Sequence, residues 1–223
     1  MNFSFDSILN VDKPPGMSSA RAVAKVKRLL PRGTKIGHAG TLDPFATGVL
    51  LLLVGKATKR CESLMDQPKQ YLATIKFGFN TSTDDPESEE IPYPNAHSVT
   101  RENIEAVLPE FTGTIQQRPP IYSAMKIGGR RAYDLARKGH DVQLQPRPVN
   151  VYSLAIVDFN WPHLTLRIDC GRGTYIRSLA RDLGERLKVG GYLTQLQRTR
   201  VGEFWIDQAI ALDRVEEKLN SEC

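Results

Sequence analysis

The feature that most constrains the fold is an uninterrupted apolar run from Leu50 to Val54. Gly48 and Val49 precede the run and Gly55 ends it, and it is too short for an ordinary helix. The pattern therefore predicts a strand from Gly48 to Val54 that is fully buried. A buried strand requires a core, and a chain of 223 residues is long enough to form one.

The letters GKAT, which start at Gly55, resemble the end of a phosphate-binding loop. In such a loop the first glycine would fall at position 50, which is Leu50, and the lysine would precede a hydroxyl residue. Lys56 precedes Ala57, and a buried strand cannot cradle an anion. The phosphate-loop interpretation is therefore rejected, and Asp43 becomes the candidate for chemistry in this stretch.

Cysteine and histidine usage argues against a disulfide framework and against a metal centre. The cysteines are far apart without a CxxC pair, and the histidines are equally scattered. The start MNFSFDSILN lacks the features of a signal peptide, and no apolar run approaches membrane-spanning length. We expect a cytoplasmic protein without a metal. The cysteines are Cys61, Cys170 and Cys223, and the histidines are His38, His97, His140 and His163.

The charge pattern points to an anionic partner. The formal net charge is +5 and the pI is near 9.1. Residues 118–147 hold seven basic residues against two acids, with Tyr122, Met125 and Tyr133 between them. Basic and aromatic residues together favour nucleic acid as the partner. An acidic tract precedes them, and we interpret it as a solvated face: Asp84, Asp85, Glu87, Glu89 and Glu90.

Hydrophobic periodicity predicts an α+β fold on a largely antiparallel sheet, because strand pairs and helices are mixed rather than strictly alternating. Alternation from Lys69 places Tyr71 on the same strand face as Ile75. Strands are expected at 7–11, 48–54, 69–79, 149–159, 163–169 and 193–204. Helices are expected from Ser18 or Ser19 to Pro31, at 100–113, at 130–138, after a Thr174 cap and at 207–219. Loops or irregular segments are expected at 37–47, 80–98 and 114–128.

Asp43 lies in a glycine-rich turn followed by a proline, directly before the buried strand. Functional side chains concentrate in such loops on rigid scaffolds. An aspartate there also serves as a purely structural turn residue, and this segment alone leaves both interpretations open.

The segment CGRGTYIRSLARDLG, residues 170–184, places Tyr175 and Arg177 in the first turn of a helix. A cation opposes the helix dipole at that end, so Arg177 indicates a carboxylate or phosphate partner. The alternative is an arginine that reaches into solvent.

A third segment, RPPIYSAMKIGGRRAYDLARKG, covers residues 118–139. Its aromatic residues, basic residues and Gly-Gly hinge are typical of a mobile arm that grips RNA. A surface loop with a short helix is the alternative.

Together with three further stretches, these segments resemble the TruB family of tRNA pseudouridine synthases. The resemblance covers nearly the whole chain in the same order: VDKPPGMSS, GHAGTLDPFATGVLLLLVGKATK, KQYLATIKFG, RPPIYSAMKIGGRRAYDLARKG, CGRGTYIRSLARDLG and LQRTRVGEF.

The resemblance implies a pseudouridine synthase fold in a single catalytic domain, 1–223, with a thumb-like arm at about 114–147. It implies isomerisation of the uridine at position 55, in the tRNA T-loop, to pseudouridine, without cofactor or metal. It implies tRNA, through its T-arm, as the partner. Nothing in the sequence demands a protein partner or an oligomer, so we expect a monomer.

The resemblance also assigns the catalytic residues. Asp43 is implied as the catalytic aspartate, which either attacks the sugar or uracil or takes a sugar proton on the way to a glycal. Both routes need the ionised carboxylate. Arg177 is implied as the cation that pairs with Asp43 and lowers its pKa. Tyr71 is implied to stack on the flipped uracil and to help remove the proton at carbon 5.

Substrate-binding residues follow from the same resemblance. Tyr175 lines the pocket and Leu196 forms its apolar wall. His38 enters the T-loop and helps displace bases, which is a binding role rather than that of a general base. Supporting or RNA-binding positions are Lys13, Lys59, Lys126, Arg130 and Arg131.

Several positions depart from the family pattern. Ala39 replaces the usual Thr, Phe45 replaces a common Leu, and Ser82 interrupts a Thr-Asp-Thr pattern. The sequence leaves no room for the C-terminal PUA domain of many relatives, so we expect weaker RNA binding with catalysis retained. The missing domain and His38 also argue against the RNA-guided relatives.

Other functions remain as alternatives to a tRNA isomerase. An RNA chaperone would open and refold tRNA without chemistry, and the Asp43→Asn variant would retain that activity. A drifted substrate, another RNA with a T-loop-like hairpin, is a further alternative, which unrelated stem-loops would test. A nucleotide-hydrolysing protein is the least favoured because of the spacing around Gly55.

Overall fold

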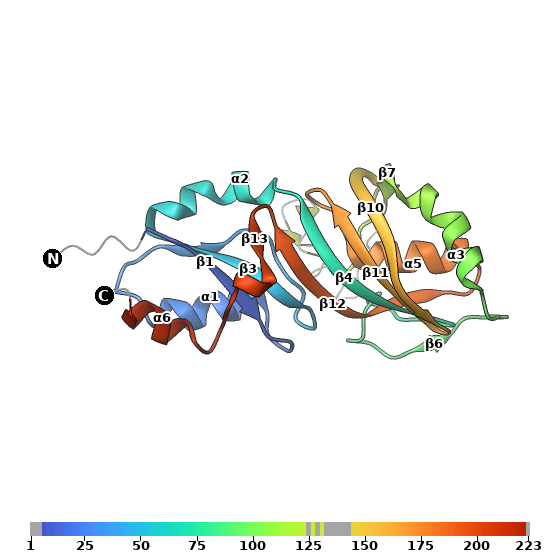
Figure 1. The fold of residues 1–223 in the computed structure, drawn as a ribbon, viewed down its shortest axis with the longest axis horizontal. Helices are drawn as coiled ribbons and strands as arrows, with labels where there is room; N and C mark the ends of the chain where they lie inside the picture. Colours follow the sequence, from blue (N-terminus) through green and yellow to red (C-terminus); the bar gives the residue numbers. More distant parts are fainter. Residues whose placement is uncertain (1–5, 124–125, 128–129, 132–143, 222–223) are drawn as a thin grey trace. The chain divides into compact units, whose positions relative to one another are not determined.

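The computed structural model describes residues 6–123, 126–127, 130–131 and 144–221. The chain divides into two compact units (Figure 1). Unit 1 comprises residues 1–72 and 196–223, and unit 2 comprises residues 73–195.

Unit 1 is built on strand β3 (Thr47–Val54), in which every residue from Gly48 onward is buried, as the apolar run predicts. Strand β1 (Ile8–Lys13) pairs antiparallel with β3 along its whole length. The short strand β2 (Ile36–His38) also pairs antiparallel with β3. The last part of β12 (Gly191–Val201) pairs with the start of β3 in parallel.

A serine cap fixes the start of the first helix of unit 1. Helix α1 (Ser19–Lys27) starts at the N-cap Ser18, whose hydroxyl accepts from the amide of Arg21, and it ends before Pro31. The predicted helix start is therefore confirmed. The remaining elements are the 3-10 helix η1 (Gly55–Arg60), α2 (Cys61–Met65), β13 (Phe204–Trp205), the 3-10 helix η3 (Ile206–Gln208), β14 (Ile210–Ala211) and α6 (Val215–Ser221).

Two expectations for unit 1 are wrong. The segment 37–47 is not all loop, since β2 includes Gly37 and His38. The segment 207–219 is not one helix, because β14 interrupts it and only α6 is α-helical. Strand β14 pairs in parallel with β1, so a contact between distant parts of the chain overrides the local helical pattern.

Unit 2 contains the predicted hairpin, β10 (Arg147–Asn160) and β11 (His163–Cys170), which pair antiparallel. Strand β4 (Lys69–Phe77) starts in unit 1 and enters unit 2 at Ala73, with Tyr71 and Ile75 buried on one face as predicted. Helix α3 (Arg101–Val107) starts at Thr100 in a capping box and continues as the 3-10 helix η2 (Leu108–Phe111). Helix α5 (Ile176–Arg186) buries Leu179 and Leu183.

The structure corrects further expectations for unit 2. Residues 114–117 are not irregular but form β7 (Gly113–Gln117), paired with β10. Arg130 and Arg131 are not helical but form β9 (Arg130–Arg131), paired with β8 (Lys126–Ile127). Residues 132–138 of that expected helix lie outside the described residues. The segment 80–98 is not all loop, since β6 (Ile91–Pro92) pairs with β5 (Phe79–Asn80).

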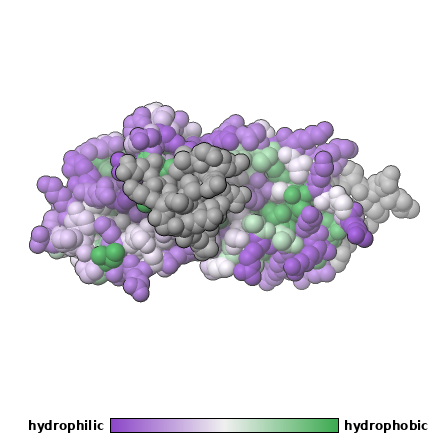
Figure 2. Space-filling view, turned by 180° about the vertical axis from the view of Figure 1, so that it is seen from behind, coloured by the Kyte–Doolittle hydropathy of each residue, from purple (hydrophilic) through white to green (hydrophobic). Residues whose placement is uncertain are grey.

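The α+β class is confirmed. Antiparallel pairing dominates among the described strands, with parallel pairing of β14 to β1 and of β12 to β3. Large exposed apolar side chains are Ile91, Ile121, Tyr152, Val157 and Trp205. The coloured residues on the face in Figure 2 are mainly hydrophilic, with scattered apolar ones. No helix in the described part of the chain is both long and apolar enough to cross a membrane.

Candidate active site

Asp43 is half-buried in unit 1, in the segment 40–46 between β2 and β3, which we call the aspartate loop. The backbone that follows Asp43 forms a tight turn, because the amide of Ala46 donates to the carbonyl of Asp43 over 3.1 Å. Buried polar side chains from distant parts of unit 1 hold the backbone on either side of Asp43. They are Lys13, Ser19 and Arg198.

Lys13 ends β1 and is fully buried. Its ammonium group donates to the carbonyls of Met17 at 2.7 Å, Pro14 at 2.8 Å and Pro44 at 3.2 Å. Burial lowers the pKa of Lys13 to about 8, while the charge of Asp43 acts in the opposite direction. Lys13 therefore places a buried positive charge near Asp43, and it anchors Pro44, the residue after Asp43.

Ser19 holds the other side of Asp43. Its hydroxyl donates to the carbonyl of Leu42 over 3.0 Å and accepts from the Leu42 amide over 2.9 Å. Because Ser18 caps α1, the second serine is free to make this contact with the aspartate loop.

Arg198 in β12 is 1% exposed and binds carbonyl groups at the start of the aspartate loop and just after it. Its guanidinium donates to Val49 at 2.7 Å, Gly40 at 3.1 Å and Thr41 at 3.4 Å. A Cβ atom at Gly48 would lie 2.3 Å from the Arg198 carbonyl oxygen, and Gly48 has a φ of +100°. Only glycine therefore allows β12 to approach β3 this closely.

Sequence reasoning missed Arg198. The signal was its spacing of two residues from Leu196, since alternate residues of a strand share a face. We predicted Leu196 to be part of an apolar wall, and a basic residue on the same face is a candidate for a buried cation.

Replacing Arg198 by Met should destabilise unit 1, because carbonyl groups of the aspartate loop lose their donors. We expect the free energy of unfolding to fall by about 1–3 kcal/mol, the usual cost of unsatisfied buried polar groups. Urea unfolding measures this loss. Arg198→Lys, which keeps the charge but not the planar fork, should fall between wild type and Arg198→Met, and equal stability of all three would contradict the anchoring role.

The buried ammonium of Lys13 should also make stability depend on pH. Burial lowers the pKa of Lys13 to about 8 in the folded chain from its ordinary value of 10.5, so the unfolded chain binds more protons between these pH values. The free energy of unfolding of the wild type relative to Lys13→Met should therefore rise with pH in this window, by at most about 1.4 kcal/mol per pH unit. Denaturation at pH 7.5, 9 and 10 measures it, and a difference that stays constant or falls would refute it.

The other predicted residues of unit 1 differ in burial. Burial, and secondly the charge of Arg198, lowers the pKa of His38 at the end of β2, which favours the neutral imidazole. Tyr71 and Leu196 are each 7% exposed. Lys59 is exposed in η1.

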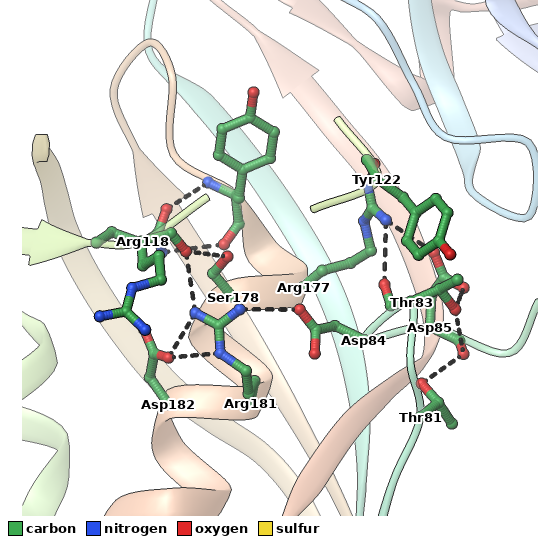
Figure 3. Close-up of polar contacts among 12 residues, drawn as sticks. Thr81, Thr83, Asp84, Asp85, Arg118, Tyr122, Arg177, Ser178, Arg181 and Asp182 are labelled. Atoms are coloured by element: carbon green, nitrogen blue, oxygen red, sulfur yellow. Dashed lines mark hydrogen bonds and ion pairs between the residues drawn. The ribbon is translucent and has the colours of Figure 1, made fainter. Parts of the chain in front are cut away.

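Arg177 lies in unit 2, in the first turn of α5, and is 5% exposed. Its guanidinium lies 3.0 Å from a carboxylate oxygen of Asp85 and also donates to the carbonyls of Thr83 at 3.1 Å and Tyr122 at 2.9 Å (Figure 3). The prediction of a carboxylate partner is therefore confirmed, whereas the solvent-exposed alternative is wrong. Asp43 belongs to unit 1, and its pairing with Arg177 stays a prediction.

The interpretation of the acidic tract as a solvated face is wrong for Asp84 and Asp85. Asp85 is 2% exposed, and its second carboxylate oxygen accepts from the Thr83 hydroxyl and the Glu87 amide. Asp84 pairs with Arg181 at 2.9 Å, and burial raises the pKa of Asp84 to about 6 (Figure 3). Tertiary pairing with α5 draws these carboxylates inward. Glu87, Glu89 and Glu90 are exposed as expected.

Tyr175 is half-buried and serves as the N-cap residue of α5, although its side chain makes no capping bond. The expectation that Thr174 caps the helix is wrong, because its hydroxyl donates to the carbonyl of Gly171 over 3.2 Å. The backbone of Tyr175 instead binds the side chain of Gln117 in both directions.

The basic positions of the expected arm are described only as backbone. Lys126, Arg130 and Arg131 lie in the β8–β9 pair, and the placement of their side chains lies outside the described residues. Among the residues that the structure describes, no group of His, Cys, Asp or Glu side chains could hold a metal ion.

Comparison with known proteins identifies the class of protein to which this fold and these residues belong. The model of the TruB family pseudouridylate synthase N-terminal domain matches residues 27–176. The model of the tRNA pseudouridylate synthase B C-terminal domain matches residues 177–222. The chain therefore belongs to the TruB family of pseudouridylate synthases, which are isomerases.

Individual relatives agree with this assignment. The chain is 42% identical to tRNA pseudouridine synthase B of Phocaeicola vulgatus over 100% of this chain and 97% of the relative. It is 45% identical to the Bacteroides fragilis protein of the same name, over 94% of this chain and 92% of that one. For the Streptomyces avermitilis protein the identity is 48%, over 96% and 74%.

A solved structure supports the fold. A chain in the crystal structure of a Cbf5-Nop10-Gar1 complex superposes with a TM-score of 0.74 and 31% identity, over 96% of this chain and 54% of that one. This chain thus spans about half the length of that structural neighbour. The predicted pseudouridine synthase fold is confirmed.

Proposed function

We propose that this chain converts the uridine at position 55, in the T-loop of tRNA, to pseudouridine, with Asp43, Tyr71 and Arg177 as catalytic residues. The observation that carries this proposal is the 42% identity, over the whole chain, to a relative named tRNA pseudouridine synthase B. The anchored position of Asp43 supports it, because a carboxylate in a fixed loop is preorganised for reaction.

The proposed reaction rearranges one nucleoside. The bond between N1 of uracil and C1′ of the ribose breaks, and a bond between C5 and C1′ forms. C5 loses a proton and N1 gains one, so the reaction consumes neither water nor an oxidant. The uridine must first leave the base stack, which costs a few kcal/mol that contacts with the protein offset.

Asp43 acts as an ionised carboxylate, either as a nucleophile or as the base that takes a sugar proton. The positive charge of buried Lys13 favours that ionised form. Arg177 is proposed to supply a second positive charge to the same carboxylate. Asp85, which binds the Arg177 guanidinium, helps to fix that arginine.

The remaining roles concern binding. Tyr71 stacks on the uracil and takes part in removing the C5 proton, while Tyr175 and Leu196 line the pocket. The neutral imidazole of His38 enters the T-loop beside the displaced bases. The basic positions Lys59, Lys126, Arg130 and Arg131 contact phosphates of the T-arm, the last three as part of the thumb-like arm 114–147.

An assay with unmodified tRNA transcript tests the proposal. Transcript labelled with tritium at C5 of its uridines is incubated with the purified chain, and release of the label is followed while nuclease digestion locates pseudouridine. We expect product at position 55, in full-length transcript and in an isolated T-arm hairpin. Transcript with cytidine at position 55 should give none. Binding without product would favour the RNA chaperone, and product in unrelated stem-loops would favour a drifted substrate.

A further inference from the structure

Two residues of unit 2 that have no role in the proposed function, Gln117 and Arg147, contact Tyr175. The side-chain amide of Gln117, at the end of β7, accepts from the Tyr175 amide over 2.8 Å and donates to the Tyr175 carbonyl over 3.0 Å. Gln117 is 1% exposed, so this pair of hydrogen bonds is shielded from water. A buried side chain that binds both polar groups of one backbone position fixes that position as a neighbouring strand would.

Arg147 holds the ring of the same tyrosine. Its guanidinium carbon lies 5.3 Å from the centroid of the Tyr175 ring, within the range of a cation–π interaction. The guanidinium also donates to the carbonyl of Gly173 over 2.9 Å. A Cβ atom at Gly173 would lie 3.2 Å from this guanidinium, and Gly173 has a φ of +81°, so glycine suits this approach.

Gln117 and Arg147 are themselves partners. They face each other in the register of β7 and β10, at the two ends of the segment 118–146. The start of that segment is tied to α5, because the carbonyl of Arg118 accepts from the Ser178 hydroxyl over 2.8 Å and from Arg181 over 2.9 Å (Figure 3). Gln117 and Arg147, at the base of the expected RNA-gripping arm, therefore both contact Tyr175 at the start of α5.

We propose that Gln117 and Arg147 are positioning residues for Tyr175: Gln117 fixes its backbone and Arg147 fixes its ring for contact with the displaced uridine. This inference rests on the proposed function, because it takes Tyr175 as a residue of the uridine pocket. Since the pair closes the base of segment 118–146, the orientation of Tyr175 depends on the β7–β10 pairing that also anchors the arm.

The kinetic test separates positioning from binding. Gln117→Leu should lower the single-turnover rate constant of pseudouridine formation by about tenfold to hundredfold, the usual effect of a misplaced group. The dissociation constant for tRNA should change less than about threefold, because phosphate contacts dominate affinity. Gln208→Leu, at an exposed glutamine of η3 outside the expected arm, is the control and should behave as wild type.

Coupling to Tyr175 gives a readout that a merely structural role would not move. In a Tyr175→Leu background, Gln117→Leu or Arg147→Met should lower the rate constant less than about twofold further, because residues that act through one another are not additive. Arg147→Lys, which keeps a cation near the ring, should restore part of the rate lost in Arg147→Met. Additive losses, or full activity of folded Gln117→Leu, would overturn the inference.

A measurement on the free protein keeps the inference distinct from the proposed function. The chain is labelled with 3-fluorotyrosine, and the fluorine resonance of Tyr175 is assigned by its disappearance in Tyr175→Phe. We expect Arg147→Met to shift this resonance and Gln117→Leu to broaden it, while Gln208→Leu leaves it unchanged. An unchanged resonance in both test variants refutes positioning, whereas an inactive wild type with the expected spectra refutes only the proposed function.

Discussion

Asp43→Asn is expected to abolish pseudouridine formation, with a loss of at least about 10⁴-fold in the single-turnover rate constant, the scale seen when a nucleophile or essential carboxylate is removed. Asparagine has a similar shape but can neither attack as an anion nor accept the proton. The carbonyls of Gly40, Leu42 and Pro44 keep their donors in this variant, so the aspartate loop should keep its shape. The variant should therefore bind tRNA within about threefold of wild type, because phosphate contacts dominate affinity.

Asp207→Asn is the matched control, since Asp207 is exposed in η3 and should leave the rate unchanged. The charge of Asp43 raises the pKa of Lys13, so its removal should lower that pKa further below about 8. Nitrogen-15 NMR of labelled Lys13 would detect this shift. Measurable pseudouridine formation by a folded Asp43→Asn protein would refute the assignment of the catalytic carboxylate.

Asp85→Ala should have the largest effect on stability in unit 2. It removes a buried counter-charge 3.0 Å from the Arg177 guanidinium, and both side chains are nearly inaccessible, at 3% and 6% exposure. Breaking a buried ion pair from one side costs about 3–5 kcal/mol, because the remaining charge stays desolvated. Urea unfolding should show this loss, and pseudouridine formation should fall with it because Arg177 loses its fixed position.

Asp84→Ala provides the comparison. Asp84 pairs with Arg181, which also contacts Asp182 at 2.7 Å, so the arginine keeps a counter-charge and the loss should be only about 1 kcal/mol. The double variant Asp85→Leu/Arg177→Met should recover much of the stability without recovering activity, because it leaves no unpaired buried charge. Equal losses for Asp84→Ala and Asp85→Ala would show that burial does not set the strength of these pairs.

Local sequence patterns were sufficient to predict the strands in which the order of apolar and polar side chains by itself indicates which residues are buried. The apolar run Leu50–Val54, the alternation around Tyr71 and Ile75, and the hairpin around Trp161 and Pro162 all correspond to strands. The sequence failed where a distant partner supplied the backbone hydrogen bonds. Strand β14 is stabilised by β1, almost 200 residues away, and β7 by β10, so neither pattern is visible in its own segment.

For the site, motif resemblance predicts Asp43, Tyr175 and Arg177 as functional residues, and the helix position of Arg177 correctly indicated a residue that needs a negative partner. It did not identify the residues that hold them. Arg198 reaches the carbonyl of Gly40 in the aspartate loop across 158 residues, and Gln117 reaches Tyr175 across 58 residues. The spacing of Arg198 from Leu196 indicates a buried cation, but no spacing rule within a segment reports which distant groups it contacts.

The sequence by itself thus determined the buried strand, the α+β class and the family resemblance, and it predicts which residues do the chemistry. Only the tertiary structure decided which polar residues are buried and what they bind. The physical reason is that a charge inside a protein is tolerated only where several acceptors converge on it. At Lys13, Arg177 and Arg198, that convergence includes acceptors from segments that are adjacent in space but not in sequence.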